Sequence, residues 1–343
     1  MKRFHGLSSL FISFCIHLIH NQVSSINIPA KSLDFESPSA GPQNTPDFEN
    51  SIWGVTSIGT IDPAFTLAPI FLGEKLRPLP CLLNSVDVAL QLALEDFDGL
   101  LFETVYRLDS YPQVEIAIIP DEEGGSVPRK YAVWGLNLGI GLMMAKSSFE
   151  TALFLLSYRG EGVAHIRFKA AGVSDITLNG TTNATQSVNK TLSISHIQAS
   201  TNISTTRVDA TNDPHLEVSF QLTGSVITIY DIFYVALDML RDMAPINQRA
   251  CLGDAITRVP DANLDLSTRE TNPPRTAYNP PYFQAEWLMR ALAQTPVYML
   301  EQRSFRELDM VLFVDEMKVG EASVRRPTSG TGLLPASGNV SNS

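Results

Sequence analysis

The sequence contains few of the residues on which metal, redox and nucleophilic chemistry depend. Among its 343 residues there are 3 cysteines and 6 histidines. The histidines beyond the N-terminal segment, His165, His196 and His215, lack the paired spacing that places two imidazoles on one metal ion. A P-loop, a dinucleotide fingerprint, a G-x-S-x-G elbow and a C-x-x-C pair are also missing. We therefore expect no metal and no cofactor, and no motif announces catalysis.

Positive charge is also scarce. The chain has 25 Lys and Arg residues against 36 Asp and Glu residues, which gives a net charge of −11. A protein of this sign has no bulk attraction for phosphate backbones, so we expect no nucleic-acid partner. Apolar residues make up 44% and charged residues 18%, which excludes wholesale disorder, collagen-like repeats and polytopic membrane proteins. The length favours one large domain or two small ones.

The N-terminal residues have the order of a secretory signal. Lys2 and Arg3 precede an apolar run from Leu7 to Ile19, and small residues follow up to Ser25. The run is broken by polar residues and is shorter than the ~20 apolar residues of a membrane span, although a retained signal anchor is the alternative. We predict cleavage after Ser25, a secreted extracellular protein and no stable membrane span.

Two features follow from secretion. Cys81 and Cys251 remain after cleavage, and an even pair in an oxidising compartment predicts one disulfide, with two buried thiols as the alternative. The chain also holds five N-glycosylation sequons, although a segment rich in Asn, Ser and Thr can generate sequons by composition alone. The acceptors are Asn179, Asn183, Asn189, Asn202 and Asn339.

Composition and periodicity divide the chain into two foldable blocks. The first has a helix from near Cys81, a strand at 114–119, a helix at 131–146 and a hairpin at 153–168. The second has a strand at 216–222, helices at 229–243 and 282–293 and a hairpin at 310–324. The predicted segments are a signal peptide (1–25), a flexible arm (26–51), a first α+β unit (52–172), a Ser/Thr/Asn-rich glycosylated insertion (173–213), a second α+β unit (214–326) with a proline-rich loop (258–281), and a disordered tail (327–343).

The two blocks resemble each other. An offset of 156 aligns the hairpins, whereas Trp134 and Trp287 align at 153, which requires a three-residue insertion. The strands at 114–119 and 216–222 also match, although the order of elements differs between the blocks. The predicted fold is therefore α+β, with two imperfectly repeated helix-plus-antiparallel-hairpin units packed as two layers; coincidence of common α+β pieces is the alternative. Gly135, Gly139 and Gly141 in the helix at 131–146 would allow close approach of another backbone.

Candidate functional side chains are carboxylates and aromatics, because acid–base chemistry needs only two suitably placed acids and aromatics can line a pocket. Glu115 and Glu217 occupy matching strand positions and could form a site if one sheet presents both. Solvated acids and core aromatics are the alternative reading throughout. The remaining candidates are Glu95, Asp96, Asp98, Asp121, Glu122, Glu123, Trp134, Trp287, Tyr282 and Phe283, and Arg325-Arg326 is a candidate processing site.

The segments YAVWGLNLGIGLMM and PPYFQAEWLMRAL, beside the Ser/Thr/Asn-rich insertion, resemble uncharacterised secreted glycoproteins of filamentous fungi. The resemblance implies an extracellular protein of unknown activity. Together with the missing catalytic motifs, it favours a non-enzymatic interaction protein whose partner is a cell-wall, matrix or host-surface component. A carboxylate-dependent hydrolase and a small-molecule carrier or tailoring protein are the alternatives, and the sequence predicts no oligomeric state.

Overall fold

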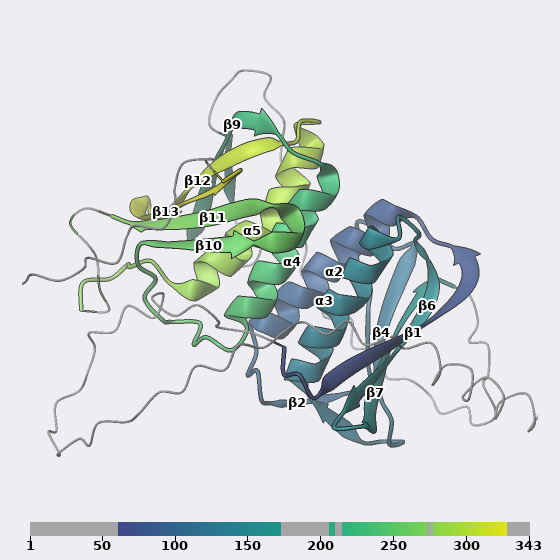
Figure 1. The fold of residues 1–343 in the computed structure, drawn as a ribbon. Helices are drawn as coiled ribbons and strands as arrows, with labels where there is room; N and C mark the ends of the chain where they lie inside the picture. The colour runs from purple at the N-terminus through teal and green to yellow at the C-terminus, as the bar shows by residue number, and fades with distance from the viewer. Residues whose placement is uncertain are drawn as a thin grey trace, which may run out of the picture. The chain divides into compact units, whose positions relative to one another are not determined.

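The structure is a computed structural model, and it describes residues 61–172, 206–209 and 215–327 apart from 272, 274, 275 and 277. The predicted signal peptide at 1–25, the arm at 26–51, all five sequons and the tail after residue 327 lie outside these ranges. Within them the chain has four α-helices and antiparallel sheets, which confirms the predicted α+β class (Figure 1). None of the helices seen there combines the length and hydropathy that a membrane span requires.

The first half of the described chain forms a five-stranded antiparallel sheet with two helices. Its strands lie in the order β1-β6-β7-β4-β3, and two short strands, β2 and β5, pair separately. The elements are β1 (Phe65–Lys75), α2 (Pro78–Ala93), β2 (Leu100–Phe102), β3 (Thr104–Tyr106), β4 (Val114–Pro120), β5 (Ser126–Pro128), α3 (Arg129–Ala145), β6 (Glu150–Tyr158) and β7 (Glu161–Ala170).

The second half forms a six-stranded antiparallel sheet, again with two helices. Its strands lie in the order β10-β11-β13-β12-β9-β8. The elements are β8 (Thr206–Asp209), β9 (Leu216–Val226), α4 (Ile229–Met243), β10 (Ala255–Val259), a 3₁₀ turn (Pro260–Ala262), β11 (Leu264–Glu270), α5 (Ala285–Glu301), β12 (Arg306–Val314) and β13 (Met317–Arg325).

The two sheets have their strands in the same relative order. Each strand of the first sheet has a counterpart in the second: β1 corresponds to β9, β6 to β12, β7 to β13, β4 to β11 and β3 to β10. The second sheet has one further strand, β8, beside β9. In each half one helix follows β1 or β9, and the other helix precedes the hairpin. The elements that the two halves share therefore follow one another in the same order, which corrects the expected difference; β2 and β5 occur only in the first half.

Two predicted correspondences are wrong. The strands at 114–119 and 216–222 do not correspond to each other. The strand that begins at Leu216 is the counterpart of β1, and the strand at 114–119 is the counterpart of β11. Strand β11 lies inside the predicted proline-rich loop. The three-residue insertion is not needed either. Helices α3 and α5 begin at 129 and 285 and end at 145 and 301, so both ends differ by 156 residues, as do those of β6 and β12. Trp134 and Trp287 are consequently not equivalent positions.

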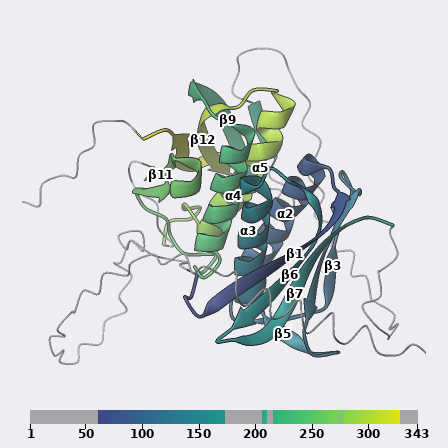
Figure 2. The same ribbon diagram turned by 45° about the vertical axis from the view of Figure 1, so that its right-hand side comes forward.

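The helices cover one face of each sheet. Helix α3 contacts β6 and β7, helix α5 contacts β9 and β12, and α2 and α4 pack against each other and against the other two helices (Figures 1 and 2). The alternation of each strand explains this arrangement: Phe154 and Leu156 of β6 are buried, while Leu155 between them is 38% exposed on the other face. The face away from the helices is therefore half-open in both sheets.

The structure does not form the predicted disulfide between Cys81 and Cys251. Cys81 lies in the first turn of α2 and is completely buried, and burial raises the pKa of its thiol to about 12. Cys251 is half-buried in the loop after α4, where its backbone forms an isolated β-bridge with Gln284. The two side chains thus belong to different local environments, and a thiol buried like that of Cys81 is unreactive.

Candidate functional site

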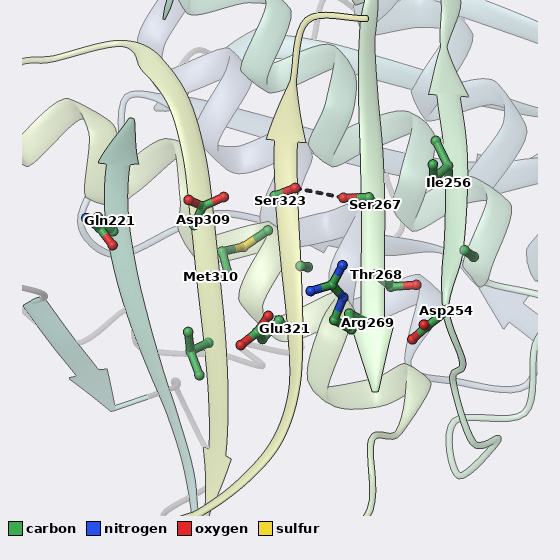
Figure 3. A pocket seen from close by; sticks show the side chains of 13 residues that line it. Gln221, Asp254, Ile256, Ser267, Thr268, Arg269, Asp309, Met310, Glu321 and Ser323 are labelled. Atoms are coloured by element: carbon green, nitrogen blue, oxygen red, sulfur yellow. Dashed lines mark hydrogen bonds between the residues drawn. The ribbon is translucent and has the colours of Figure 1, made fainter. Parts of the chain in front are cut away.

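An open groove lies on the outer face of the six-stranded sheet, opposite the helices (Figure 3). Its volume is about 930 Å³. It crosses five neighbouring strands, β10, β11, β13, β12 and β9, so residues from 221 to 323 meet in it. The lining residues that project from the sheet are Gln221, Asp254, Ile256, Ser267, Arg269, Asp309, Val311, Glu321 and Ser323.

The alternation of the strands places these side chains together. In β12, Leu308 and Met310 are fully buried, while Asp309 is only partly buried because it belongs to the opposite face. Strand pairing then aligns the outer residues in rows across the sheet. One row runs Ile256, Ser267, Ser323, Asp309 and Gln221, and a second runs Arg269, Glu321 and Val311.

Most charges on this face are neutralised within it. One guanidinium nitrogen of Arg325 donates to both carboxylate oxygens of Asp309, at 2.6 and 2.7 Å, in a charge-assisted contact. Lys318 pairs with Glu321 at the turn of the hairpin. These pairs fix the carboxylates but leave the face close to electroneutral.

Arg269 and Asp254 are the exception. Asp254 immediately precedes β10 and continues its register, in which Ala255 lies opposite Thr268, so it comes opposite Arg269 (Figure 3). Asp254 accepts a hydrogen bond from the Glu270 N–H at 2.8 Å. In the described part of the chain neither Arg269 nor Asp254 forms an ion pair. The groove therefore presents one cationic donor and one anionic acceptor that lack a charged partner.

The floor of the groove is held by hydroxyl groups. The hydroxyls of Ser267 and Ser323 lie 2.7 Å apart, and Thr268 donates to the Gly253 carbonyl at 2.8 Å. A serine nucleophile needs a neighbouring base, but the two serines bond to each other instead. The lining thus offers hydroxyl groups for hydrogen bonding with a ligand.

Three of the predicted acids line a second open pocket, where α2 ends near the loop that follows α4. Its volume is about 560 Å³. Glu95 accepts from the buried Arg129 at 2.6 Å, and Asp98 accepts from Lys130 at 2.8 Å. Glu95, Asp96 and Asp98 are therefore brought together, but two of them are held as ion pairs that anchor the first turn of α3.

The structure does not bring Glu115 and Glu217 together. Glu115 lies on β4 of the five-stranded sheet, and Glu217 lies on β9 of the six-stranded one. Arg107 and Lys169 each place a nitrogen 3.5 Å from the carboxylate of Glu115. The strands that carry these residues are not equivalent, so the predicted match between them is wrong. The two acids lie on different sheets and form no catalytic pair.

The loop acids and histidines stand apart from the groove. Asp121 begins the turn that also carries Glu122 and Glu123, and its carboxylate is 3.7 Å from His165. Burial lowers the pKa of His165 despite this neighbour. His215 and Asp315 lie 2.6 Å apart at the surface, while His196 is outside the described residues. No group of three or more potential metal ligands occurs within the described ranges.

The predicted pocket aromatics pack in the core of their own halves. Trp134 contacts Phe65 and Phe97, with ring centroids 5.4 and 6.0 Å apart. Trp287 packs 6.5 Å from Tyr282, and Phe283 is buried. None of these rings lines the groove. Core packing, which was the alternative reading, therefore accounts for them.

The candidate processing site is part of the fold. Arg325 ends β13 opposite Asp265, and its side chain is bound to Asp309. The N–H of Arg326 donates to the buried Glu307 at 3.2 Å, and its guanidinium donates to the Val226 carbonyl. A protease would have to separate these contacts before it could bind the segment in extended form.

Sequence reasoning did not single out the residues of the groove. Arg269 lies inside the predicted proline-rich loop at 258–281, and Asp254 lies just before that loop. The signal that was available is alternation: in β11, Leu264, Leu266 and Thr268 are buried between the more exposed Asp265, Ser267 and Arg269.

Comparison with known proteins gives little further guidance. No protein-family model matches the chain, and neither does any curated protein. Among solved structures, the tandem DUF26 ectodomain of the Arabidopsis thaliana cysteine-rich receptor-like protein PDLP8 is similar at 10% identity, covering 76% of this chain and 96% of that one. Its TM-score is 0.20, and no conclusion about this chain rests on it.

Proposed function

We propose that this chain is a secreted, N-glycosylated, non-enzymatic protein that binds a glycan of the cell wall, the extracellular matrix or a host surface. The N-terminal signal pattern and the clustered sequons support the extracellular setting. The groove on the outer face of the six-stranded sheet is the binding surface. The observation that carries the proposal is the pair of Asp254 and Arg269, which lie opposite each other in the groove and form no ion pair within the described residues.

A polyhydroxylated ligand fits this pair better than an ionic one. Each hydroxyl can donate one hydrogen bond and accept others, so one hydroxyl of a neighbouring pair can donate to Asp254 while the next accepts from Arg269. The other charges on the face are paired, and a chain of net charge −11 gains nothing overall from a polyanion. Ile256, which is 77% exposed at the rim, offers an apolar surface for the C–H groups of a sugar ring.

Binding to a panel of immobilised neutral and acidic polysaccharides tests the proposal. We expect binding to at least one neutral glycan, and both Arg269→Gln and Asp254→Asn should weaken it at least tenfold, about 1.4 kcal/mol. The matched control is Arg258→Gln, because Arg258 is on the same sheet but is paired with Asp265 at 3.0 Å. Binding that both groove variants retain would place the binding surface elsewhere, and no binding to any glycan would refute the proposal.

We also propose that the two halves arose by duplication of one unit made of a strand, a helix, two strands, a second helix and a hairpin. The shared strand order and the 156-residue offset support this proposal. The groove belongs to only one half, because the outer face of the five-stranded sheet has Leu153 and Leu155 where the six-stranded sheet has Asp309 and Val311. Each pair is related by the same offset. The proposed copies have thus diverged on their outer faces while keeping similar inner faces.

A further inference from the structure

The groove is longer across the strands of the six-stranded sheet than along them. No strand contributes more than three consecutive lining positions, which at about 3.4 Å per residue span about 7 Å. In the other direction one row of outward-facing residues crosses five neighbouring strands, from Ile256 on β10 to Gln221 on β9 (Figure 3). Neighbouring strands lie about 4.8 Å apart, so the row is about 19 Å long. Between its ends it contains Ser267, Ser323 and Asp309.

The floor of the groove is low in the middle of the sheet and has longer side chains on both sides. Ser267 and Ser323, which are hydrogen-bonded to each other, are the small residues of the floor. Two positions away in the same strands, Arg269 and Glu321 lie opposite each other on one side. Two positions from Ser323 in the other direction, Arg325 lies on the second side. A ligand in the groove is therefore confined between these side chains and follows the row across the strands.

The groove is open at both ends within the described part of the chain. Ile256 lies on β10, the edge of the sheet, and no described strand covers the other side of β10. At the far end, β8 begins at Thr206, which lies opposite Phe220, so Gln221 is one position past the last pair of β8. The volume of about 930 Å³ is several times that of one sugar ring. The groove thus has room for a chain of sugars, and its ends allow such a chain to continue beyond it.

The two ends of the row offer different contacts. At the β10 end, Asp254 and Arg269 provide an acceptor and a charged donor, and Ile256 provides an apolar surface. At the β9 end, the exposed amide of Gln221 can donate and accept hydrogen bonds. A short ligand therefore gains most from the β10 end, and only a ligand that spans the row reaches Gln221.

We propose that the groove binds an extended chain of a β-1,4-linked neutral glycan, which lies along the row with about one sugar over each strand and reaches Gln221. This inference rests on the proposed function, because it concerns the same groove. A β-1,4 linkage joins opposite sides of each ring and produces a straight chain, in which one residue advances about as far as one strand spacing. An α-1,4 linkage coils the chain, so that it would leave the row after a few residues.

Titration calorimetry of the full chain with soluble oligosaccharides tests the length of the site. The probes are β-1,4-linked oligomers of glucose and of N-acetylglucosamine, with α-1,4-linked oligomers of glucose as the matched control. For at least one β-1,4 series we expect the affinity to rise at least tenfold from the disaccharide to about the pentasaccharide and then to level off. Equal affinity for the two lengths, the same rise in the α-1,4 series, or no binding of either β-1,4 series would overturn the inference. The proposed function is overturned separately, by the absence of binding to every glycan of the panel.

Variants at the two ends of the row separate this inference from the proposed function. Arg269→Gln should weaken the binding of short and long oligomers alike, because both use the β10 end. Gln221→Ala should weaken the binding of the pentasaccharide about threefold or more and leave that of the disaccharide unchanged. The control is Glu217→Ala, on the same strand and face but outside the groove, which should change neither. If Arg269→Gln weakened the binding of the pentasaccharide and Gln221→Ala did not, the ligand would not span the row, and only this inference would fail.

Discussion

Asn137 of α3 donates a hydrogen bond to the buried carboxylate of Asp238 on α4, with a distance of 2.8 Å between Nδ2 and Oδ1. Arg241 completes the cluster by donating to Asn137 at 2.8 Å and to Asp238 at 3.1 Å. The two helices cover different sheets, so this network joins the two halves of the fold. A buried carboxylate requires such partners, because an unpaired one carries its full desolvation cost.

Asn137→Ala should therefore destabilise the protein by about 2–4 kcal/mol, since Asp238 and Arg241 each lose a buried partner. Chemical denaturation followed by circular dichroism measures the free energy of unfolding. The control is Asn247→Ala, because the Asn247 side chain accepts from the Arg249 N–H in an exposed turn, and its loss should cost less than about 1 kcal/mol. Equal effects of the two substitutions would show that the interhelical network contributes no special stability.

Asp87 predicts an unusual pH dependence of stability. Burial in α2 raises the pKa of its carboxyl to about 6. The hydrogen bond from Gln91 lowers this pKa, but by less than burial raises it. Because the folded-state pKa is above the unfolded value, folding favours the protonated form. The contribution of this group is therefore fully present below about pH 4 and is lost as pH rises through about 6.

Replacing Asp87 by Asn should remove this loss, because the amide keeps a hydrogen-bond acceptor for Gln91 but cannot ionise. We expect Asp87→Asn to raise the free energy of unfolding at pH 7 by about 2–3 kcal/mol and to leave it nearly unchanged at pH 4. Thermal or urea unfolding between pH 4 and 8 measures the difference. Asp109→Asn, at an exposed position, is the control. If both variants changed the free energy of unfolding with pH in the same way, the pH dependence could not be assigned to Asp87.

The sequence predicted the segments whose pattern is local. Helix α4 occupies the predicted residues 229–243, and the hairpin of β6 and β7 encloses the predicted turn at Gly160, because apolar periodicity and turn glycines are local signals. Strand β1 escaped prediction because Pro69 interrupts it, and an edge strand can accept a proline on its free side. Helix α5 was predicted to end at Ala293, but it continues through Pro296 to Glu301.

The groove could not be predicted, because its residues come together only through the order of strands. Asp309, taken alone, is an ordinary outward-facing acid on a half-buried strand. Its neighbours Ser323 and Gln221 lie on β13 and β9, and only the pairing of both strands with β12 brings the three together. The predicted pair of Glu115 and Glu217 failed for the same reason, since a single sequence does not specify which strand takes which place in a sheet.

The glycines of α3 provide the sharpest test of the packing between a helix and the five-stranded sheet. A Cβ at Gly139 would lie 2.9 Å from the Phe154 ring, and one at Gly135 would lie 2.6 Å from a methyl carbon of Leu156. At Gly141 the nearest atom, on the Tyr234 ring, is 3.8 Å away, which is an ordinary contact. Two of the three glycines thus permit a close approach, but to side chains of the sheet and not to the backbone that their spacing predicted.

Gly139→Ala and Gly141→Ala should therefore change stability in opposite directions. Alanine is better than glycine by about 1 kcal/mol in a helix interior, and Gly141→Ala should gain up to that amount. At Gly139 the overpacking against Phe154 costs about 1–3 kcal/mol, so the net effect should be destabilising. Thermal unfolding of both variants measures the contrast. Stabilisation by both substitutions would mean that β6 can move away from the helix, and that Gly139 is not needed for the contact.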